Sequence, residues 1–152
     1  MQAFVAMSQS TWEHKLDIFR GWGWSDEDIM LVFRKCPNFM NASERKIMNA
    51  MDFLVNKIGW QSTDIALCPD IFLMSLEKRV IPRCLVIKVL QSKGLVKKKY
   101  NLSSFVKPFE KLFLDRFMTK YLDQVPELMN IYQRKEGFQA LDMNIYVCSS
   151  KL

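Results

Sequence analysis

Lysine and arginine side chains are the residues of this sequence best suited to binding chemistry, and they gather between Lys78 and Lys120. That segment of 43 residues holds 12 basic residues against 2 acidic ones, Glu110 and Asp115. A positive field of this density attracts polyanions, and nucleic acid is the commonest polyanion that proteins bind. The alternative is a solvated helix face that only keeps the protein soluble. The segment therefore predicts a nucleic-acid-binding surface, with a solubilising surface as the second interpretation.

Arg79 and Arg83 are the strongest candidates for contacts with nucleic acid, because residues four apart share one face of a helix. The planar fork of arginine fits a phosphate or a guanine edge better than lysine does. Arg116 and Lys120 have the same spacing and offer a second basic face. The remaining candidates for nucleic-acid binding are Lys78, Lys88, Lys93, Lys97, Lys98, Lys99, Arg34 and Arg45. Residues 97–99 follow a glycine stop and are expected in an exposed loop, for which a solvated turn is the alternative.

No group of residues in this sequence is typical of an active site. The four cysteines lack the CxxC and CxxH spacings of zinc and redox sites. His14 is the single histidine, and neither a nucleophile motif nor a phosphate-binding glycine loop occurs. We therefore predict that the protein is not an enzyme and uses no metal, no cofactor and no small-molecule substrate. An apolar run of about 18 residues is also missing, so we predict no membrane span.

The elements that must position the basic residues are predicted to be helices throughout. Only 5 glycines and 5 prolines occur in 152 residues, which leaves too few turn signals for a sandwich or barrel. Ser10 and Glu13 have the spacing of a capping box and predict a first helix over 11–21. Ser25 opens a second helix that ends before Pro37. The fold class is therefore all-α.

The later helices follow from similar signals. Ser43 opens a third helix that Gly59 closes, and a short helix through Ile65 stops at Pro69. The segment from 75 to 92 is expected to form one helix that either kinks or locally loses a hydrogen bond at Pro82. Further helices are predicted from residue 107 and from residue 126. Residues 134–152 show no clear period and are interpreted as a divergent tail, with disorder as the alternative.

The helices form an internal repeat. The pair Gly23-Trp24 recurs 36 residues later as Gly59-Trp60, and Cys36-Pro37 recurs 32 residues later as Cys68-Pro69. A proline flanked by an apolar residue four positions before it and another three positions after it occurs at 37, 69 and 126. One such unit cannot bury its own apolar face, so the units are expected to stack into a solenoid. The equivalent positions of the two tryptophans favour helix packing over base stacking.

Several segments carry a resemblance to a known family. They are TWEHKLDIFRGWGWSDEDI (11–29), FRKCPNFMNASERKI (33–47), MDFLVNKIGW (51–60), SLEKRVIPR (75–83), VLQSKGL (89–95) and FMTKYLDQVPELMNIY (117–132). Together they resemble the mitochondrial transcription termination factor (mTERF) family, and its plant members in particular, over residues 3–133. The resemblance implies a right-handed superhelix of Pro-terminated helical repeats that binds nucleic acid along a basic concave groove. It assigns residues 1–133 to a partial repeat array and leaves 134–152 as the tail.

The resemblance also implies a function and a location. Family members act in mitochondria or chloroplasts in transcription, its termination or RNA processing, and they generally carry more repeats behind a transit peptide. No transit peptide is visible here, so the chain resembles the C-terminal part of such a protein. We expect a monomer that binds double-stranded DNA rather than RNA and regulates or terminates transcription. The alternatives are an organellar RNA-binding factor and a helical scaffold for acidic protein partners.

Overall fold

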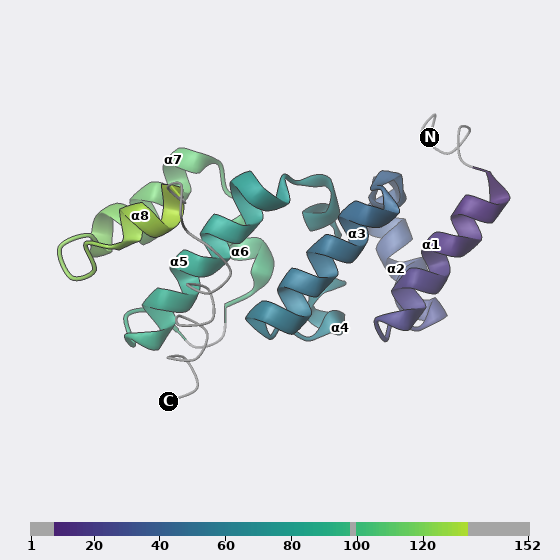
Figure 1. Cartoon of the computed structure of the whole chain (residues 1–152), viewed down its shortest axis with the longest axis horizontal. Helices are drawn as coiled ribbons and strands as arrows, with labels where there is room; N and C mark the ends of the chain where they lie inside the picture. Colours follow the sequence, from purple (N-terminus) through teal and green to yellow (C-terminus); the bar gives the residue numbers. More distant parts are fainter. Residues whose placement is uncertain (1–7, 98–99, 134–152) are drawn as a thin grey trace. The chain divides into compact units, whose positions relative to one another are not determined.

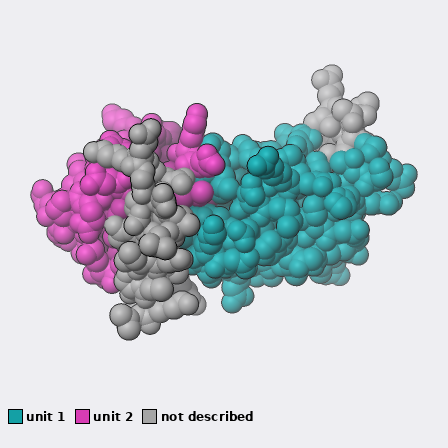
Figure 2. All heavy atoms as spheres, viewed as in Figure 1, with its two compact units in different colours: residues 1–76 teal, residues 77–152 magenta. Residues whose placement is uncertain are grey.

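The computed structural model describes residues 8–97 and 100–133. These residues form helices joined by short turns, without a strand among them, which confirms the all-α prediction (Figure 1). The chain divides into two compact units, residues 1–76 and residues 77–152 (Figure 2). Each unit is described by itself below. The right-handed superhelix and the boundary at residue 133 stay predictions.

The first helix of unit 1, α1 (Gln9–Gly21), begins two residues earlier than the capping box at Ser10 predicts. Ser8 is the N-cap, because its backbone is extended and its side chain accepts a hydrogen bond of 3.2 Å from the amide of Thr11. Ser10 lies inside the helix, so the capping box with Glu13 was wrong. The helix ends at Gly21 as predicted.

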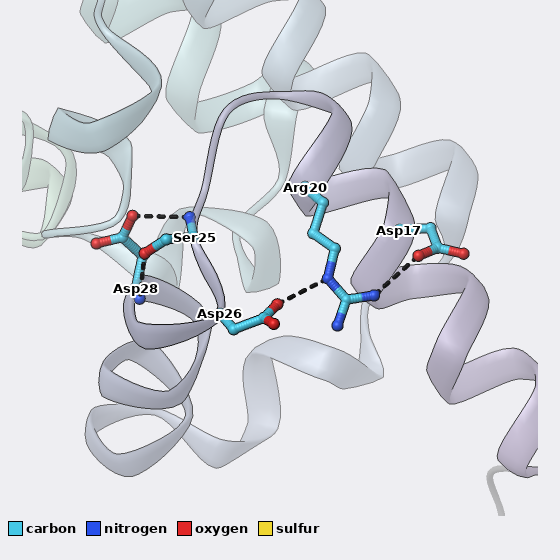
Figure 3. A network of polar contacts seen from close by, with 5 residues as sticks. All are labelled: Asp17, Arg20, Ser25, Asp26 and Asp28. Carbon is cyan, nitrogen blue, oxygen red and sulfur yellow. Dashed lines mark hydrogen bonds and ion pairs between the residues drawn. The ribbon is translucent and has the colours of Figure 1, made fainter.

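The second helix, α2 (Asp26–Lys35), begins with the predicted serine cap. The Asp28 amide donates to Oγ of Ser25 at 3.1 Å, and the Ser25 amide donates to the Asp28 carboxylate at 2.9 Å (Figure 3). Arg20 joins the two helices across the intervening turn, with ion pairs of 2.7 Å to Asp26 and 2.9 Å to Asp17. These exposed ion pairs orient the turn more than they stabilise it.

The third helix has an α-helical and a π-helical part. In α3 (Glu44–Met51) the N-cap Ser43 accepts a hydrogen bond of 3.1 Å from the Lys46 amide, as the sequence predicts. The helix continues as the π-helical segment η3 (Asp52–Ile58) up to Gly59. A short helix, α4 (Ser62–Ile65), then ends before Pro69.

Each cysteine-proline pair of unit 1 starts a short 3₁₀ helix. These are η2 (Pro37–Asn41) and η4 (Pro69–Leu73), which contact each other. The apolar residues three positions after the prolines, Met40 and Phe72, are fully buried. Pro37 and Pro69 therefore each start a short helix that brings the next apolar side chain of the repeat into the core. The third predicted copy differs, because Met129, three positions after Pro126, is 37% exposed.

The core of unit 1 is a cluster of aromatic rings. Phe19 stacks on Trp24 with 4.7 Å between ring centroids, and it contacts Phe39 at 5.3 Å and Phe72 at 5.4 Å. The indole Nε1 of Trp24 donates a hydrogen bond of 2.8 Å to the Ser62 carbonyl oxygen. Trp24 is therefore a packing residue, as predicted.

Unit 2 is built around its most apolar helix. A π-helical turn, η5 (Leu76–Val80), leads into α5 (Ile81–Ser92), most of whose residues are buried. Pro82 is the second residue of α5, and the residue before α5, Val80, already has an α-helical backbone. The helix expected over 75–92 is therefore a π-helical turn that continues into an α-helix at Ile81, one residue before the proline.

The remaining helices of unit 2 differ in part from the predicted ones. The structure has a five-residue helix, α6 (Leu102–Val106), that was not predicted. The next helix begins at α7 (Glu110–Phe113), three residues later than expected, and continues as η6 (Leu114–Met118) and η7 (Thr119–Tyr121). The last, α8 (Leu128–Gln133), packs against α5.

Three glycines mark successive copies of the repeat. Gly23, Gly59 and Gly94 have φ angles of 98°, 92° and 71°, and each lies one or two residues beyond the end of a helix. The next residue donates its amide to a carbonyl one turn or more back: Trp24 to Phe19 at 3.1 Å, Trp60 to Leu54 at 2.8 Å and Leu95 to Leu90 at 3.0 Å. The bonds at Gly23 and Gly94 reach five residues back, as in the Schellman pattern of helix ends, and the bond at Gly59 reaches six. All three turns favour glycine, because only glycine adopts positive φ without strain. Gly94 therefore forms a third glycine turn. The Gly-Trp pair in the sequence marks only the first two of these turns.

Candidate nucleic-acid interface

The two compact units differ in charge. Unit 1 holds 7 Lys or Arg against 9 Asp or Glu, a net charge of −2, and unit 2 holds 15 against 7, a net charge of +8. The predicted basic segment from Lys78 to Lys120 belongs entirely to unit 2. Any polyanion-binding surface is therefore expected mainly on this unit.

Arg79, at the end of η5, points its guanidinium group toward the turn between α6 and α7. Its Nε donates to the Val106 carbonyl at 2.8 Å, and its Nη2 donates to the carbonyls of Lys107 at 2.6 Å and Pro108 at 2.9 Å. The residue is half-buried. Two of the three guanidinium nitrogens of Arg79 are therefore used in hydrogen bonds inside the protein and not for the predicted phosphate contact.

Arg83, one turn further along in α5, lies deeper. It is 2% exposed, and its Nη1 donates to the carbonyls of Phe105 at 3.0 Å, Val106 at 3.1 Å and Pro108 at 2.5 Å. The guanidinium carbon lies 4.7 Å from the ring centroid of Phe113. Burial lowers the pKa of this guanidinium, and the nearby charge of Arg79 lowers it further.

These contacts correct the expectation for the two arginines. They do share one helix face, but that face turns toward the interior of unit 2. A buried guanidinium hydrogen-bonded to carbonyls cannot reach a phosphate, so Arg83 is left out of the interface proposed below. Helical spacing shows which residues lie together, but it does not show which way their common face points.

Arg116 and Lys120 lie on the helix that runs from α7 to η7, and both are exposed. The Arg116 guanidinium lies 5.1 Å from the Phe117 ring centroid, and the Lys120 ammonium lies 5.6 Å from that of Tyr121. A cation over a ring face is held by the ring's negative charge distribution. Both cations are therefore oriented while their outer faces stay open to solvent.

Lys111 is an exposed cation on the same helix that the sequence analysis did not single out. It precedes Arg116 by five residues, which would place the two about 140° apart around an α-helix. Arg116 itself lies in the π-helical segment η6, whose wider i→i+5 turns reduce that angle. The place of Lys111 in the basic segment could have marked it as a candidate for nucleic-acid binding. Ideal α-helical spacing, however, would place it on a different helix face from Arg116.

The other predicted lysines of unit 2 lie at different depths. Lys88 is half-buried on α5, and burial lowers the pKa of its ammonium. Lys93 is exposed and pairs with Glu127 at 3.8 Å, while Lys78 and Lys97 are also exposed. Lys98 and Lys99 lie outside the described residues.

Arg34 and Arg45, the two predicted residues of unit 1, are both exposed. Arg34 lies in the last turn of α2 and Arg45 in the first turn of α3. They flank η2, which Pro37 starts, as the sequence predicts. Their participation in nucleic-acid binding stays a prediction.

The described part of the chain contains neither a metal-binding cluster nor a membrane-spanning helix. No group of three or more histidine, cysteine, aspartate or glutamate side chains there is placed to hold a metal ion. Cys36 donates to the Asp70 carboxylate at 3.3 Å, and no disulfide joins the described cysteines. Among the same residues, no helix combines the length and the apolar character needed to cross a bilayer.

The comparison with family models identifies this arrangement of helices. The mTERF model matches residues 1–114, three quarters of the chain. The chain belongs to the mTERF family. This mTERF chain is also 28% identical, over 124 residues, to "Transcription termination factor MTERF15, mitochondrial" of Arabidopsis thaliana. The match covers 81% of the mTERF chain and 27% of that protein, so the chain spans about a quarter of the length of this curated relative. No solved structure matches it.

Proposed function

We propose that this mTERF chain is a nucleic-acid-binding protein that binds double-stranded DNA through the exposed cations of unit 2. The observation that carries the proposal is the exposure of Arg116 and Lys120, each held over an aromatic ring, on a unit with a net charge of +8. Lys93, Lys97 and Lys111 extend the exposed basic surface of the same unit. Family membership makes nucleic acid the expected polyanion.

Such a surface binds mainly through phosphates. Lysine and arginine contacts release the counterions condensed on nucleic acid, and this release supplies affinity without sequence specificity. Lysine acts as a point charge, and exposed arginine adds a fork that fits a phosphate. The proposed interface therefore positions a nucleic-acid backbone, and no base-reading residue is assigned.

The biological role we propose is regulation or termination of transcription in an organelle. The Arabidopsis relative is named as a mitochondrial transcription termination factor, which supports a mitochondrial role over a chloroplast one. RNA binding by the same cations is the second candidate, because phosphate contacts serve both polymers. We propose that the chain acts as a monomer.

The proposal is tested by measuring duplex DNA affinity over a salt series. The Arg116→Ala/Lys120→Ala double variant should flatten the dependence of log K on log salt by about 2, because two phosphate contacts are lost. Lys57→Ala is the matched control, since Lys57 is an exposed lysine of unit 1 outside the predicted interface. It should leave the slope unchanged.

Two results of this assay would overturn the proposal. One is a wild-type affinity that does not depend on salt, and the other is an equal effect of the double variant and the control. Competition between duplex DNA and single-stranded RNA separates the two nucleic-acid candidates. A preference for acidic peptides over both would instead indicate a scaffold for acidic protein partners.

A further inference from the structure

Four successive carbonyl oxygens, those of residues 105–108, accept hydrogen bonds from two arginine side chains. Arg79 donates to three of them and Arg83 donates to three, so two are shared. The first two carbonyls belong to the last residues of α6, and the other two belong to the turn into α7. We call residues 105–109 the arginine-held corner.

This corner needs outside support because the helix that enters it is short. Neither α6 nor α7, which begins the longer helix through Tyr121, has a side-chain hydrogen bond at its N-cap, and α6 has only five residues. Isolated helices of this length are unstable in water. The last carbonyls of any helix also lack helical partners and carry partial negative charge, which favours cations beside them. The two guanidinium groups supply both the support for the short helix and the positive charge beside its last carbonyls.

The arginines also connect the corner to its neighbours. Arg83 extends from α5, lies at 4.7 Å from the Phe113 ring of α7 and bonds the end of α6. Phe113 in turn stacks on Tyr132 of α8 with 5.7 Å between centroids. The orientation of the helix that starts at α7 therefore depends on this pair, and that helix carries Lys111, Arg116 and Lys120.

We propose that Arg79 and Arg83 are positioning residues for nucleic-acid binding: they fix the arginine-held corner and so orient the exposed cations that follow it. This inference rests on the proposed function. The two arginines would act by holding backbone carbonyls in place and not by contacting the nucleic acid. Neither arginine is expected to touch phosphate.

Charge-preserving substitution separates positioning from direct contact. Lysine keeps the charge of arginine but cannot donate in a fork to three carbonyls. Under positioning, Arg79→Lys and Arg79→Ala therefore lower duplex DNA affinity by the same factor, about fivefold or more. Under direct contact, Arg79→Lys keeps most of the affinity and Arg79→Ala flattens the salt slope by about 1.

Arg116 supplies the matched control, because it is an exposed arginine of the same unit. Arg116→Lys should keep most of the affinity, and Arg116→Ala should flatten the salt slope. Arg79 is chosen over Arg83 for substitution because it is half-buried, so its variants are expected to fold.

Amide hydrogen exchange gives a readout that does not need nucleic acid. Both Arg79 variants should exchange faster than the wild type over residues 102–113, while both Arg116 variants should not. Wild-type exchange in Arg79→Lys would overturn the positioning proposal whether or not the chain binds DNA. A wild-type chain that binds no nucleic acid would overturn the proposed function instead, so the two failures are distinguishable.

Discussion

Lys15 and Arg83 are the basic side chains that lie in the interior of the described structure, and both donate to backbone carbonyls. Lys15, in α1, donates from Nζ to the Met40 carbonyl of η2 at 2.8 Å. Burial lowers its pKa from 10.5, and the charge of Glu44 opposes that change only in part. A buried cation of this kind fixes two elements together, but it costs desolvation free energy.

The lowered pKa of Lys15 predicts how stability changes with pH. Because the unfolded chain has the higher pKa, it binds more protons than the folded chain as the pH approaches 10.5. The free energy of unfolding contributed by this group therefore rises with pH in that range. The wild type should gain stability relative to Lys15→Met as the pH is raised toward 10.5 in urea unfolding experiments. Parallel stability curves for the two proteins would contradict this account of Lys15.

Glycine turns are the element that recurs most regularly in this chain. Gly59 has a φ of 92°, and a Cβ atom added there would meet nothing within 4 Å, so the cost of a substitution is conformational rather than steric. Gly59→Ala should lower the free energy of unfolding by about 1–2 kcal/mol. Chemical denaturation measures the change.

Gly21 provides the matched control for Gly59. It is the last residue of α1, its surroundings are also open, and its φ is not positive. Alanine is the better helix former by about 0.5–1 kcal/mol, so Gly21→Ala should stabilise the protein or leave it unchanged. Equal destabilisation by the two substitutions would show that the turn at Gly59 does not require positive φ.

Helix ends with a local chemical signal could be predicted from sequence. The caps at Ser25 and Ser43 and the stops at Pro37 and Gly59 all depend on residues within one turn. Ser8 was missed because Ser10 satisfies the same local rule, and only the observed backbone distinguishes them. Local signals therefore define most elements to within a few residues.

Features that depend on tertiary contacts could not be predicted in this way. α6 has no capping side chain, and its C-terminal carbonyls are satisfied by arginines more than 20 residues earlier in the chain. The same contacts turn Arg79 and Arg83 away from solvent. Composition therefore locates the basic segment, but only the structure shows which of its side chains face solvent.

At the scale of the whole molecule, the division of charge is the feature that bears on function. Unit 1 carries a net charge of −2 and an aromatic core, and unit 2 carries +8 together with the proposed interface. Electrostatic attraction acts through the summed field and falls with ionic strength. We therefore expect nucleic acid to cover unit 2 first and unit 1 less.

Lysine footprinting of the unmodified chain tests this central claim most directly. The protein is acetylated with and without duplex DNA, and in parallel with single-stranded RNA, and each lysine is quantified by mass spectrometry. The proposed interface predicts protection of Lys93, Lys97, Lys111 and Lys120 in unit 2, lost as salt is raised, with little protection of the exposed Lys35 and Lys57 in unit 1. Equal protection of all these lysines, or protection confined to unit 1, would contradict it.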